Sequence, residues 1–421
     1  MRFLYTLVFY LSLPLVLLRL LWRARKAPAY ASRWGERFGL VPARTDSRPA
    51  IWLHAVSVGE TIAALPLLQQ LQQRYPDWQL LVTSTTPTGS ARVAAAFGDS
   101  VLHVYSPYDL PDCVGRFLRR MRPALAIIME TELWPNTIAA CRSAGVPVLV
   151  ANARLSQKSA AGYGRVAGLS RAMLEAITVI AAQSEADAER FRELGASCVA
   201  VTGNIKFDLQ IEPSQQQLAE RYRQRWQSGG GRPVLLAAST HEGEDERLLQ
   251  SFSLMLEHHP QLLLVLVPRH PERFGRVQML AEQAFKVQLH SRAEPLAATT
   301  QVLIGDSMGE LMALLGASDL VFMGGTWVEN GGHNFIEPAA WGKPIFSGPS
   351  LYNFAEVSRL LLAAGGLRLV QSPAELAGQV GQLLDDPQQA QQMGAAARTV
   401  ATDNRGALAR LLLQIDQLLV K

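Results

Sequence analysis

Glu60 is the residue whose type and position most clearly suggest chemistry. It ends the motif His54-Ala-Val-Ser-Val-Gly-Glu60, in which an apolar run breaks at Ser57 and a helix is predicted over residues 60–75. Such a strand–turn–helix unit presents its turn at the carboxyl end of a parallel strand, where α/β proteins bind ligands. The helix dipole favours an ionised carboxylate there, and that carboxylate can accept a proton from an attacking hydroxyl. A plain helix cap is the alternative interpretation.

A second polar cluster follows the predicted strand 124–129 in the motif Glu130-Thr-Glu-Leu-Trp-Pro-Asn136. Two carboxylates at i and i+2 can belong to a metal site, but no Asp or His partners follow at ligand spacing. We therefore expect one acid to cap the helix that starts at Pro135 and the other to form an ion pair. Lys206 follows a further apolar run, and it either faces the same site or is an ordinary surface lysine.

Four loops in the second half of the sequence carry polar and glycine residues directly after predicted strands. These strands are residues 233–238, 262–267, 302–305 and 320–323. The loops are Ser239-Thr-His-Glu-Gly-Glu244, Pro268-Arg-His-Pro271, Asp306-Ser-Met-Gly-Glu-Leu311 and Gly324-Gly-Thr-Trp327, the last continuing to Gly331-Gly-His-Asn-Phe-Ile-Glu-Pro338. The carboxyl ends of parallel strands meet at one edge of a sheet, so these loops are predicted to form one binding site.

The composition of these loops suits a nucleotide. Glycine pairs let the backbone approach a phosphate, and the helices predicted after Gly309 and Asn334 can supply N-terminal donors to it. Arg269 offers a planar cation for a phosphate or carboxylate. Glu337 lies one turn into the helix after Asn334 and can accept hydrogen bonds from ribose hydroxyls. Ordinary turns without a ligand are the alternative.

The elements that must position these residues are strands and helices in regular alternation. The chain has 421 residues, more than one core usually holds, and its 48% hydrophobic and 18% charged residues are typical of soluble α/β proteins. Further strands are predicted at residues 51–56, 79–84, 100–104, 146–151, 179–182, 287–289 and 344–346, with helices between them. This pattern predicts two parallel, doubly wound sheets in two domains with a cleft between them.

The domain boundaries follow from composition. Residues 208–232 are rich in Gln, contain Pro213 and end in Ser228-Gly-Gly-Gly231, which is typical of an interdomain linker. We predict an N-terminal Rossmann-like domain over residues 35–207 and a C-terminal one over residues 233–405. The helix predicted over residues 406–421 could pack on either domain. The three cysteines are far apart and form neither a metal-ligand pattern nor a disulfide framework.

The N-terminal segment is apolar and basic. Residues 3–18 form an apolar run, and residues 1–50 carry a net charge of +7 against +4 for the whole chain, so the charge does not indicate a nucleic-acid groove. Most of the charge follows the run, which favours an uncleaved membrane anchor over residues 1–25 above a cleaved signal peptide. The positive-inside tendency then predicts a cytoplasmic body with the N-terminus outside. A helix lying in the membrane plane is a variant of this anchor.

Taken together, these motifs resemble those of the 3-deoxy-D-manno-octulosonic acid (Kdo) transferases of Gram-negative bacteria, glycosyltransferases of the GT-B fold. The resemblance covers essentially the whole chain, including the anchor. It rests on His54-Ala-Val-Ser-Val-Gly-Glu60, Glu130-Thr-Glu-Leu-Trp-Pro-Asn136, Gly203-Asn-Ile-Lys206, Ser239-Thr-His-Glu-Gly-Glu244, Pro268-Arg-His-Pro271, Gly309-Glu-Leu311 and Asn334-Phe-Ile-Glu-Pro338. The set in this order is specific, whereas no single motif is.

The resemblance implies that Glu60 is the general base and that Glu130 and Lys206 stabilise the transition state. It implies CMP binding by Pro268, Arg269, Gly309, Glu310, Leu311, Asn334, Phe335, Ile336 and Glu337. Additional candidates in the same loops are Ser239, Thr240, Glu242, Gly331, Gly332 and His333. A single phosphate can be neutralised by an arginine and helix N-termini, so no metal and no other cofactor is expected.

The implied reaction is an inverting transfer of Kdo from CMP-Kdo to a hydroxyl of the lipid A precursor, lipid IVA, in lipopolysaccharide biosynthesis. The first domain would then bind the acceptor and the second the CMP-sugar, with the enzyme anchored at the cytoplasmic face of the inner membrane. The basic surface near residues 23–48 would face the acceptor's phosphates. The alternatives are another GT-B enzyme, such as a nucleotide-sugar epimerase or a UDP-dependent transferase, and a catalytically inert, membrane-bound nucleotide-binding protein.

Overall fold

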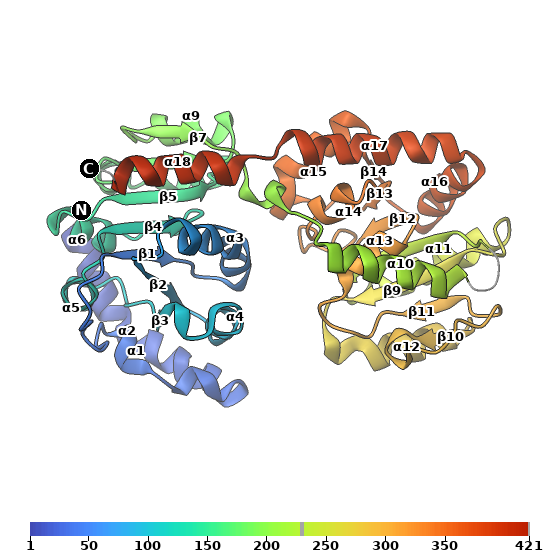
Figure 1. The fold of residues 1–421 in the computed structure, drawn as a ribbon, viewed down its shortest axis with the longest axis horizontal. Helices are drawn as coiled ribbons and strands as arrows, with labels where there is room; N and C mark the ends of the chain where they lie inside the picture. Colours follow the sequence, from blue (N-terminus) through green and yellow to red (C-terminus); the bar gives the residue numbers. More distant parts are fainter. Residues whose placement is uncertain (228–230, 420–421) are drawn as a thin grey trace. The chain divides into compact units, whose positions relative to one another are not determined.

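Strands and helices alternate along the whole chain, and the computed structural model folds them into two α/β units (Figure 1). It describes residues 1–227 and 231–419. Unit 1 comprises Met1–Asp208 and Arg405–Lys421, and unit 2 comprises Leu209–Asn404. The chain therefore passes from unit 1 to unit 2 and then returns to unit 1.

Unit 1 is built on a seven-stranded sheet with the strand order β3-β2-β1-β4-β5-β6-β7. All neighbouring strands are parallel. The strands are β1 (Ala50–His54), β2 (Gln79–Ser84), β3 (Leu102–Tyr105), β4 (Leu125–Met129), β5 (Val148–Ala153), β6 (Val179–Ala182) and β7 (Val199–Val201). The central strands are buried on both faces, which explains their continuous apolar sequences.

Helices cover both faces of this sheet. Ile51 and Leu53 of β1 belong to a core completed by α3 (Val58–Arg74), α4 (Pro87–Phe97) and α18 (Ala407–Leu419). Trp52 belongs to the core on the opposite face, which includes α5 (Pro111–Met121), α6 (Pro135–Ser143), α8 (Ala167–Leu174) and α9 (Glu185–Glu193). The unit also contains α1 (Arg2–Lys26), α2 (Trp34–Arg37) and α7 (Gln157–Gly164). Alternation along a strand thus sends neighbouring residues into two separate cores.

Unit 2 has a seven-stranded parallel sheet with the order β10-β11-β9-β8-β12-β13-β14. Its strands are β8 (Val234–Thr240), β9 (Leu263–Pro268), β10 (Val287–Leu289), β11 (Val302–Ile304), β12 (Leu320–Met323), β13 (Ile345–Ser347) and β14 (Leu367–Leu369). Its helices are α10 (Pro213–Gln227), α11 (Asp245–Leu256), α12 (Phe274–Glu282), α13 (Leu311–Ala317), α14 (Ile336–Ala340), α15 (Ala355–Ala364), α16 (Pro373–Asp385) and α17 (Pro387–Asp403).

The predicted fold class, two doubly wound parallel sheets, is confirmed. Every strand predicted from the sequence is present, and its ends differ by at most two residues from those observed. The prediction missed β7 and β14, which are only three residues long.

The stretch 208–232 was predicted to be an interdomain linker, but the structure shows a helix in it. It contains α10, which belongs to unit 2 and buries Ala219 and Trp226. A Cβ on Gly316 of α13 would lie 2.7 Å from the Cβ of Ala219, so the two helices pack closely. The high glutamine content therefore marks the solvent side of a helix, because amphipathic helices expose their polar residues. Residues 228–230 of this stretch lie outside the described residues.

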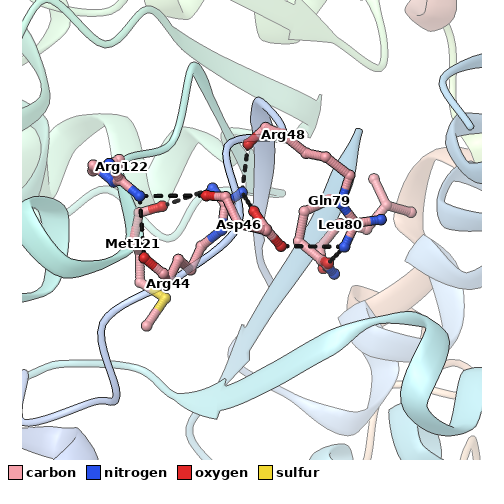
Figure 2. Close-up of polar contacts among 7 residues, drawn as sticks. All are labelled: Arg44, Asp46, Arg48, Gln79, Leu80, Met121 and Arg122. Atoms are coloured by element: carbon pink, nitrogen blue, oxygen red, sulfur yellow. Dashed lines mark hydrogen bonds and ion pairs between the residues drawn. The ribbon is translucent and has the colours of Figure 1, made fainter. Parts of the chain in front are cut away.

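The basic segment after α2 is fastened to unit 1 by its own arginines, as Figure 2 shows. The Arg44 guanidinium donates to the Met121 carbonyl at 3.0 Å and pairs with Asp46, and its side chain is only 4% exposed. Arg122 donates to the Arg44 carbonyl, and Arg48 donates to the Gln79 side chain. These contacts tie the segment to the end of α5 and to β2.

The prediction that the whole basic segment 23–48 faces an acceptor is therefore too broad. Arg37 is 5% exposed and donates to the Thr85 carbonyl, and Arg33 pairs with Glu36. Arginines committed to internal hydrogen bonds hold the fold of this segment and leave less charge for a ligand. Arg23 and Arg25, at the end of α1, are exposed.

Candidate active site

Each sheet has a topological switch point, where chain connections leave in opposite directions from adjacent strands. In unit 1 it lies between β1 and β4, and in unit 2 between β8 and β12. Ligands of open α/β sheets bind outside the carboxyl ends of strands at such points. The loop with Glu60 follows β1 and that with Glu130 follows β4, while the loops after β8 and β12 contain the polar motifs of unit 2.

Glu60 is the third residue of α3 and forms a variant of the capping box. The Ser57 hydroxyl accepts a hydrogen bond from the Glu60 N–H at 3.1 Å, and the Glu60 Oε2 accepts one from the Val56 N–H at 2.8 Å. Both contacts satisfy backbone donors that would be unpaired at the start of a helix. The helix-cap interpretation thus describes the geometry of Glu60 correctly. The hydrogen bond from the Val56 N–H holds its carboxylate at the switch point.

The expectation that the helix dipole keeps Glu60 readily ionised needs correction. Burial raises the pKa of Glu60, which is 7% exposed, and the neighbouring Glu130 raises it further, while the contacts with Ser57 and Val56 lower it. Burial also raises the pKa of Glu132, with Glu60 as the next cause. Three carboxylates from two loops therefore lie close enough to interact, and desolvation outweighs the dipole.

Glu130 and Lys206 form an ion pair. Lys206 Nζ lies 3.0 Å from Glu130 Oε1, and both side chains are partly buried. Glu130 follows β4 with a φ of 54°, a left-handed conformation that is uncommon outside glycine and is found at functional sites. Asn152, at the end of β5, has the same conformation with a φ of 55°, and its side chain accepts a hydrogen bond from the N–H of Ile205. The ends of β4 and β5 thus position both members of the pair.

The helix that starts at Pro135 is capped by a residue that sequence reasoning missed. The buried Asp109 carboxylate accepts hydrogen bonds from the N–H groups of Asn136 and Thr137 and from the Thr137 hydroxyl. Neither Glu130 nor Glu132 caps α6, so that half of the prediction is wrong, whereas the ion pair predicted for the other acid is confirmed. The cap comes from the β3–α5 loop, 27 residues earlier, so local spacing carried no signal for it.

In unit 2 the buried Glu244 organises the loops at the switch point. Its carboxylate accepts hydrogen bonds from the N–H groups of His241, Gly325, Thr326 and Trp327, at 2.6 to 2.9 Å. It is 0% exposed, so these contacts replace its hydration. This joins the loop after β8 to the loop after β12.

Gly324 lets the same two loops come close together. A Cβ at this position would lie 2.6 Å from the Ser239 carbonyl oxygen, so a larger residue cannot be accommodated without displacement. Ser239 itself has a φ of 56°. The strands β8 and β12 therefore end in a rigid, closely packed pair of turns, which suits the precise positioning of a ligand.

The remaining predicted nucleotide residues lie in neighbouring loops of unit 2. Asn334 donates to Glu337 at 3.0 Å, burial raises the pKa of Glu337, and the nearby Arg269 lowers it. The Arg269 N–H donates to the Thr240 carbonyl, which places Arg269 beside the end of β8. Phe335 and Ile336 are fully buried, so only their backbone could meet a ligand.

The loop after β11 carries Gly309, Glu310 and Leu311 at the start of α13. Gly309 has a φ of 88°, and Glu310 accepts from Ser307 and lies 3.1 Å from His290 Nε2. Hydrogen bonds with Ser307 and Tyr222 and the His290 imidazole outweigh burial, so the pKa of Glu310 is lowered. Glu310 is therefore an ionised acceptor at neutral pH.

His241 and His333 were not recognised as partners from the sequence. Their rings are stacked at an interplanar angle of 6°, and their Nε2 atoms lie 2.8 Å apart. Burial lowers the pKa of both imidazoles, for His333 to about 4. They belong to loops 92 residues apart, so no local motif could have paired them.

Glu242, the other additional candidate after β8, points elsewhere. It forms an exposed ion pair with Arg276 of α12. Among the described residues, no group of three or more His, Cys, Asp and Glu side chains could hold a metal ion.

Two family models match the chain. Residues 32–209 match the 3-deoxy-D-manno-octulosonic-acid transferase (Kdo transferase) model, and residues 220–400 match the model of glycosyl transferases group 1. The Kdo transferase of Haemophilus influenzae is 43% identical over 416 residues, which are 98% of this chain and 97% of that protein. The Bordetella pertussis Kdo transferase is 34% identical over 93% of this chain and 94% of its own length.

The chain belongs to the Kdo transferase family. Its fold is also found in solved structures with little sequence identity. The UDP-GlcNAc 2-epimerase of Neisseria meningitidis has a TM-score of 0.59 at 15% identity, covering 86% of this chain and 99% of its own. The Anabaena protein HepE, solved with UDP and glucose, has a TM-score of 0.56 at 14% identity, covering 89% and 100%. These likenesses concern the fold alone.

For this Kdo transferase family member, the structure groups the predicted site residues by unit. Glu60, Glu130 and Lys206 lie at the carboxyl edge of the unit 1 sheet, within reach of one another's charges or in contact. The predicted CMP residues, with Ser239, Thr240, Gly331, Gly332 and His333, lie at the carboxyl ends of β8 and β9 or in the loops and helix starts that follow β9, β11 and β12 of unit 2. Sequence reasoning missed Asp109, Glu244 and the partnership of His241 with His333, all of which act across loops distant in sequence.

Proposed function

We propose that this protein transfers Kdo from CMP-Kdo to a hydroxyl of the lipid A precursor, lipid IVA, with inversion at the anomeric carbon. Membership in the Kdo transferase family supports the sugar and the reaction class. The observation that carries the proposal is Glu60, a buried carboxylate of raised pKa at a switch point, beside the Glu130–Lys206 pair.

In this mechanism Glu60 removes the proton from the acceptor hydroxyl as the hydroxyl attacks the anomeric carbon. A general base works best when its pKa approaches the pH of the reaction, and the raised pKa of Glu60 moves it in that direction. The ionised base also needs a fixed position, which the Val56 N–H provides. CMP leaves with the electron pair of the broken glycosidic bond.

Glu130 and Lys206 would stabilise the transition state as a pair. The reacting carbon gains positive character and lies next to the donor's own carboxylate. A carboxylate such as Glu130 can stabilise the former charge, and the ammonium group of Lys206 can hold the latter. Their 3.0 Å separation means that each is positioned by the other before the donor arrives.

Unit 2 would hold the CMP moiety. Arg269 supplies a cation for the phosphate, and Glu337 accepts from ribose hydroxyls. The N–H groups of Gly331 and Gly332 donate to Ser350 and Gly325, so these two glycines shape the loop around the ligand. Glu244 stabilises this region, because its carboxylate accepts hydrogen bonds from the backbone of both switch-point loops. No step in this scheme requires a metal.

The membrane association proposed for the enzyme rests on α1. Within Arg2–Arg25, an 18-residue window has a mean hydropathy of 2.0, and 6% of that window is buried. The acceptor is a lipid, so an enzyme held at the cytoplasmic face of the inner membrane meets it at a higher effective concentration.

The deciding experiment is mass spectrometry of lipid IVA after incubation with CMP-Kdo and the purified protein. We expect the precursor to gain the mass of one or more Kdo residues, whereas UDP-sugars offered in parallel give no product. An unchanged precursor with CMP-Kdo, or transfer from a UDP-sugar, would refute the proposal.

A further inference from the structure

An ordinary surface helix exposes polar residues, whereas α1 exposes an apolar face. The side chains that are partly or fully buried recur at helical spacing and include polar ones: Tyr5, Thr6, Phe9, Ser12, Leu13, Val16, Leu17 and Leu20. The exposed face is strongly apolar, with Phe3, Leu4, Leu7, Val8, Leu11, Leu15, Leu18, Leu21 and Trp22 between 43% and 81% exposed. The helix therefore turns a mixed apolar and polar face toward the rest of unit 1, and it leaves a continuous apolar strip outward.

The N-terminal half of α1 contacts the rest of unit 1 through Thr6, Phe9 and Tyr10. The Asn136 side chain of α6 donates to the Thr6 hydroxyl at 3.0 Å, and the Tyr10 hydroxyl donates to Asp112 of α5 at 2.6 Å. The ring of Phe9 lies 6.4 Å from that of Tyr108. Figure 1 shows α1 starting near α6 and passing α5. The contacts connect α1 to the same Asn136–Asp109 cap that begins α6.

The other end of α1 packs against the segment that follows it in the chain. Leu20 is buried, and the chain folds back after Lys26 through a short 3₁₀ helix, η1 (Pro28–Ala31), so that the Arg23 guanidinium lies 5.6 Å from the Tyr30 ring centroid. The Trp34 indole then donates to the Tyr30 carbonyl, and α2 follows. The N-terminal half of α1 thus contacts α6 and α5, and its other end contacts η1, which leads into α2.

A spanning helix cannot satisfy both sets of contacts. About 20 residues are needed to cross the roughly 30 Å hydrocarbon core, so one end of a spanning α1 would lie on the far side of the membrane from unit 1. Thr6 and Tyr10 would then lose Asn136 and Asp112, and these partners cannot enter hydrocarbon without a high desolvation cost. We infer that α1 lies in the plane of the membrane, with its apolar face inserted and both of its ends on the side of unit 1.

The occupant of the apolar face is a bilayer surface rich in anionic lipid. Arg2, Arg19, Arg23 and Arg25 are all exposed on α1, so cations flank an apolar strip as in interfacial helices. The outward strip extends along the whole helix, and no residue of it is acidic. This inference rests on the membrane association proposed above, and it replaces the expected external N-terminus with a cytoplasmic one.

Cysteine labelling tests the topology. The exposed Cys198 is first replaced by serine, which leaves the buried Cys113 and Cys141. Single cysteines are then introduced as Arg2→Cys and Arg25→Cys, and spheroplasts are treated with a membrane-impermeant maleimide before and after lysis. We expect both positions to react only after lysis. Labelling of Arg2→Cys in intact spheroplasts would establish a spanning helix and overturn the inference.

Vesicle binding tests the occupant with matched variants. Leu7→Glu combined with Leu11→Glu changes the exposed face, and Thr6→Val changes the contact face. We expect the double variant to bind phosphatidylglycerol–phosphatidylethanolamine vesicles at least about tenfold more weakly with an unchanged unfolding midpoint. Thr6→Val should lower the midpoint and bind as the wild type does. Unchanged vesicle binding by the double variant would overturn the inference. A wild-type protein that dimerises through this face, and a double variant that loses the dimer but still binds vesicles, would overturn it as well.

Kdo transfer in the same preparations separates this inference from the proposed function. Transfer by a protein with a periplasmic Arg2→Cys, or by one that stays in the soluble fraction, would reject the in-plane helix and leave the function standing. Absence of transfer by the wild type, with both cysteines protected, would reject the function and leave the placement of α1 standing.

Discussion

At the scale of single residues, Glu60 has a structural role at the start of α3 and is also the proposed base. Its carboxylate closes the first turn of α3 through the Val56 N–H, yet it is buried and lies near Glu130 and Glu132. An ionised group in such a place is reactive because its charge is poorly solvated. The position of Glu60 could be predicted from its strand–turn–helix motif. Its raised pKa could not, because the burial and the neighbouring carboxylates come from the loop after β4.

The first prediction concerns the rate of transfer. Glu60→Gln keeps an oxygen for the Val56 N–H but removes the basic site, so the turnover rate should fall about 10²- to 10⁴-fold while CMP affinity stays within twofold. Transfer rates and calorimetric titration with CMP measure the two effects. Glu189→Gln, on the exposed side of α9, is the matched control and should be fully active. A Glu60→Gln enzyme that retains more than a tenth of the rate would exclude the base role.

The second prediction concerns the stability of the same variant. Because the pKa of Glu60 is raised on folding, its contribution to the free energy of unfolding is fully present below the unfolded pKa of about 4.5 and is lost as the pH rises through the folded value. Glu60→Gln should therefore raise the thermal midpoint at pH 8 by about 1 °C or more, and this gain should disappear near pH 4. Thermal midpoints of the variant and the wild type, measured between about pH 4 and pH 8, decide the sign of the difference. A variant less stable than the wild type at pH 8 would contradict it.

At the scale of elements, the strands and helices that carry the site were predictable, whereas the contacts that fix their loops were not. Apolar runs and turn residues located β1, β4, β8 and β12. Glu244 and Asp109, however, satisfy backbone donors of loops far along the chain. A buried carboxylate of this kind has no sequence signature, since its partners are main-chain groups that every residue carries.

The third prediction tests how much the loops of unit 2 depend on Glu244. Glu244→Gln places an amide NH₂ group against backbone donors, so the free energy of unfolding should fall by about 2–4 kcal/mol and CMP affinity should drop with it. Denaturant unfolding and calorimetry are the measurements. Glu242→Gln lies two residues away in an exposed ion pair and should change both quantities little. Equal behaviour of the two variants would show that the four backbone contacts are dispensable.

At the scale of the whole molecule, the division into two units was predictable from the restart of β–α alternation, and the assignment of the terminal helix was not. The helix α18 packs in the unit 1 core through Leu411, Leu412 and Ile415, and Asp416 binds Arg74 and Tyr75 at the end of α3. An amphipathic helix shows which of its faces is buried but not which sheet buries it.

The fourth prediction follows from this packing. Leu411 is fully buried, so Leu411→Ala should reduce the free energy of unfolding of unit 1 by about 2–5 kcal/mol. Hydrogen exchange resolved by peptide should show faster exchange in α3 and β1 and unchanged exchange in β8 and β9. Leu413→Ala removes the same atoms from a side chain that is 56% exposed and serves as the control. Faster exchange confined to unit 2 would disprove the assignment of α18.

Because the chain returns to unit 1 at its end, unit 2 can complete its fold before unit 1 during synthesis. Unit 2 is one continuous segment, whereas unit 1 needs residues 405–421 to close its core. A nascent polypeptide leaving the ribosome can thus finish its second half while the first still exposes the apolar surface that α18 covers. The helix α1 emerges before either unit is complete. Under the proposed membrane association, a ribosome translating this message would already be held at the bilayer when unit 1 acquires its last helix.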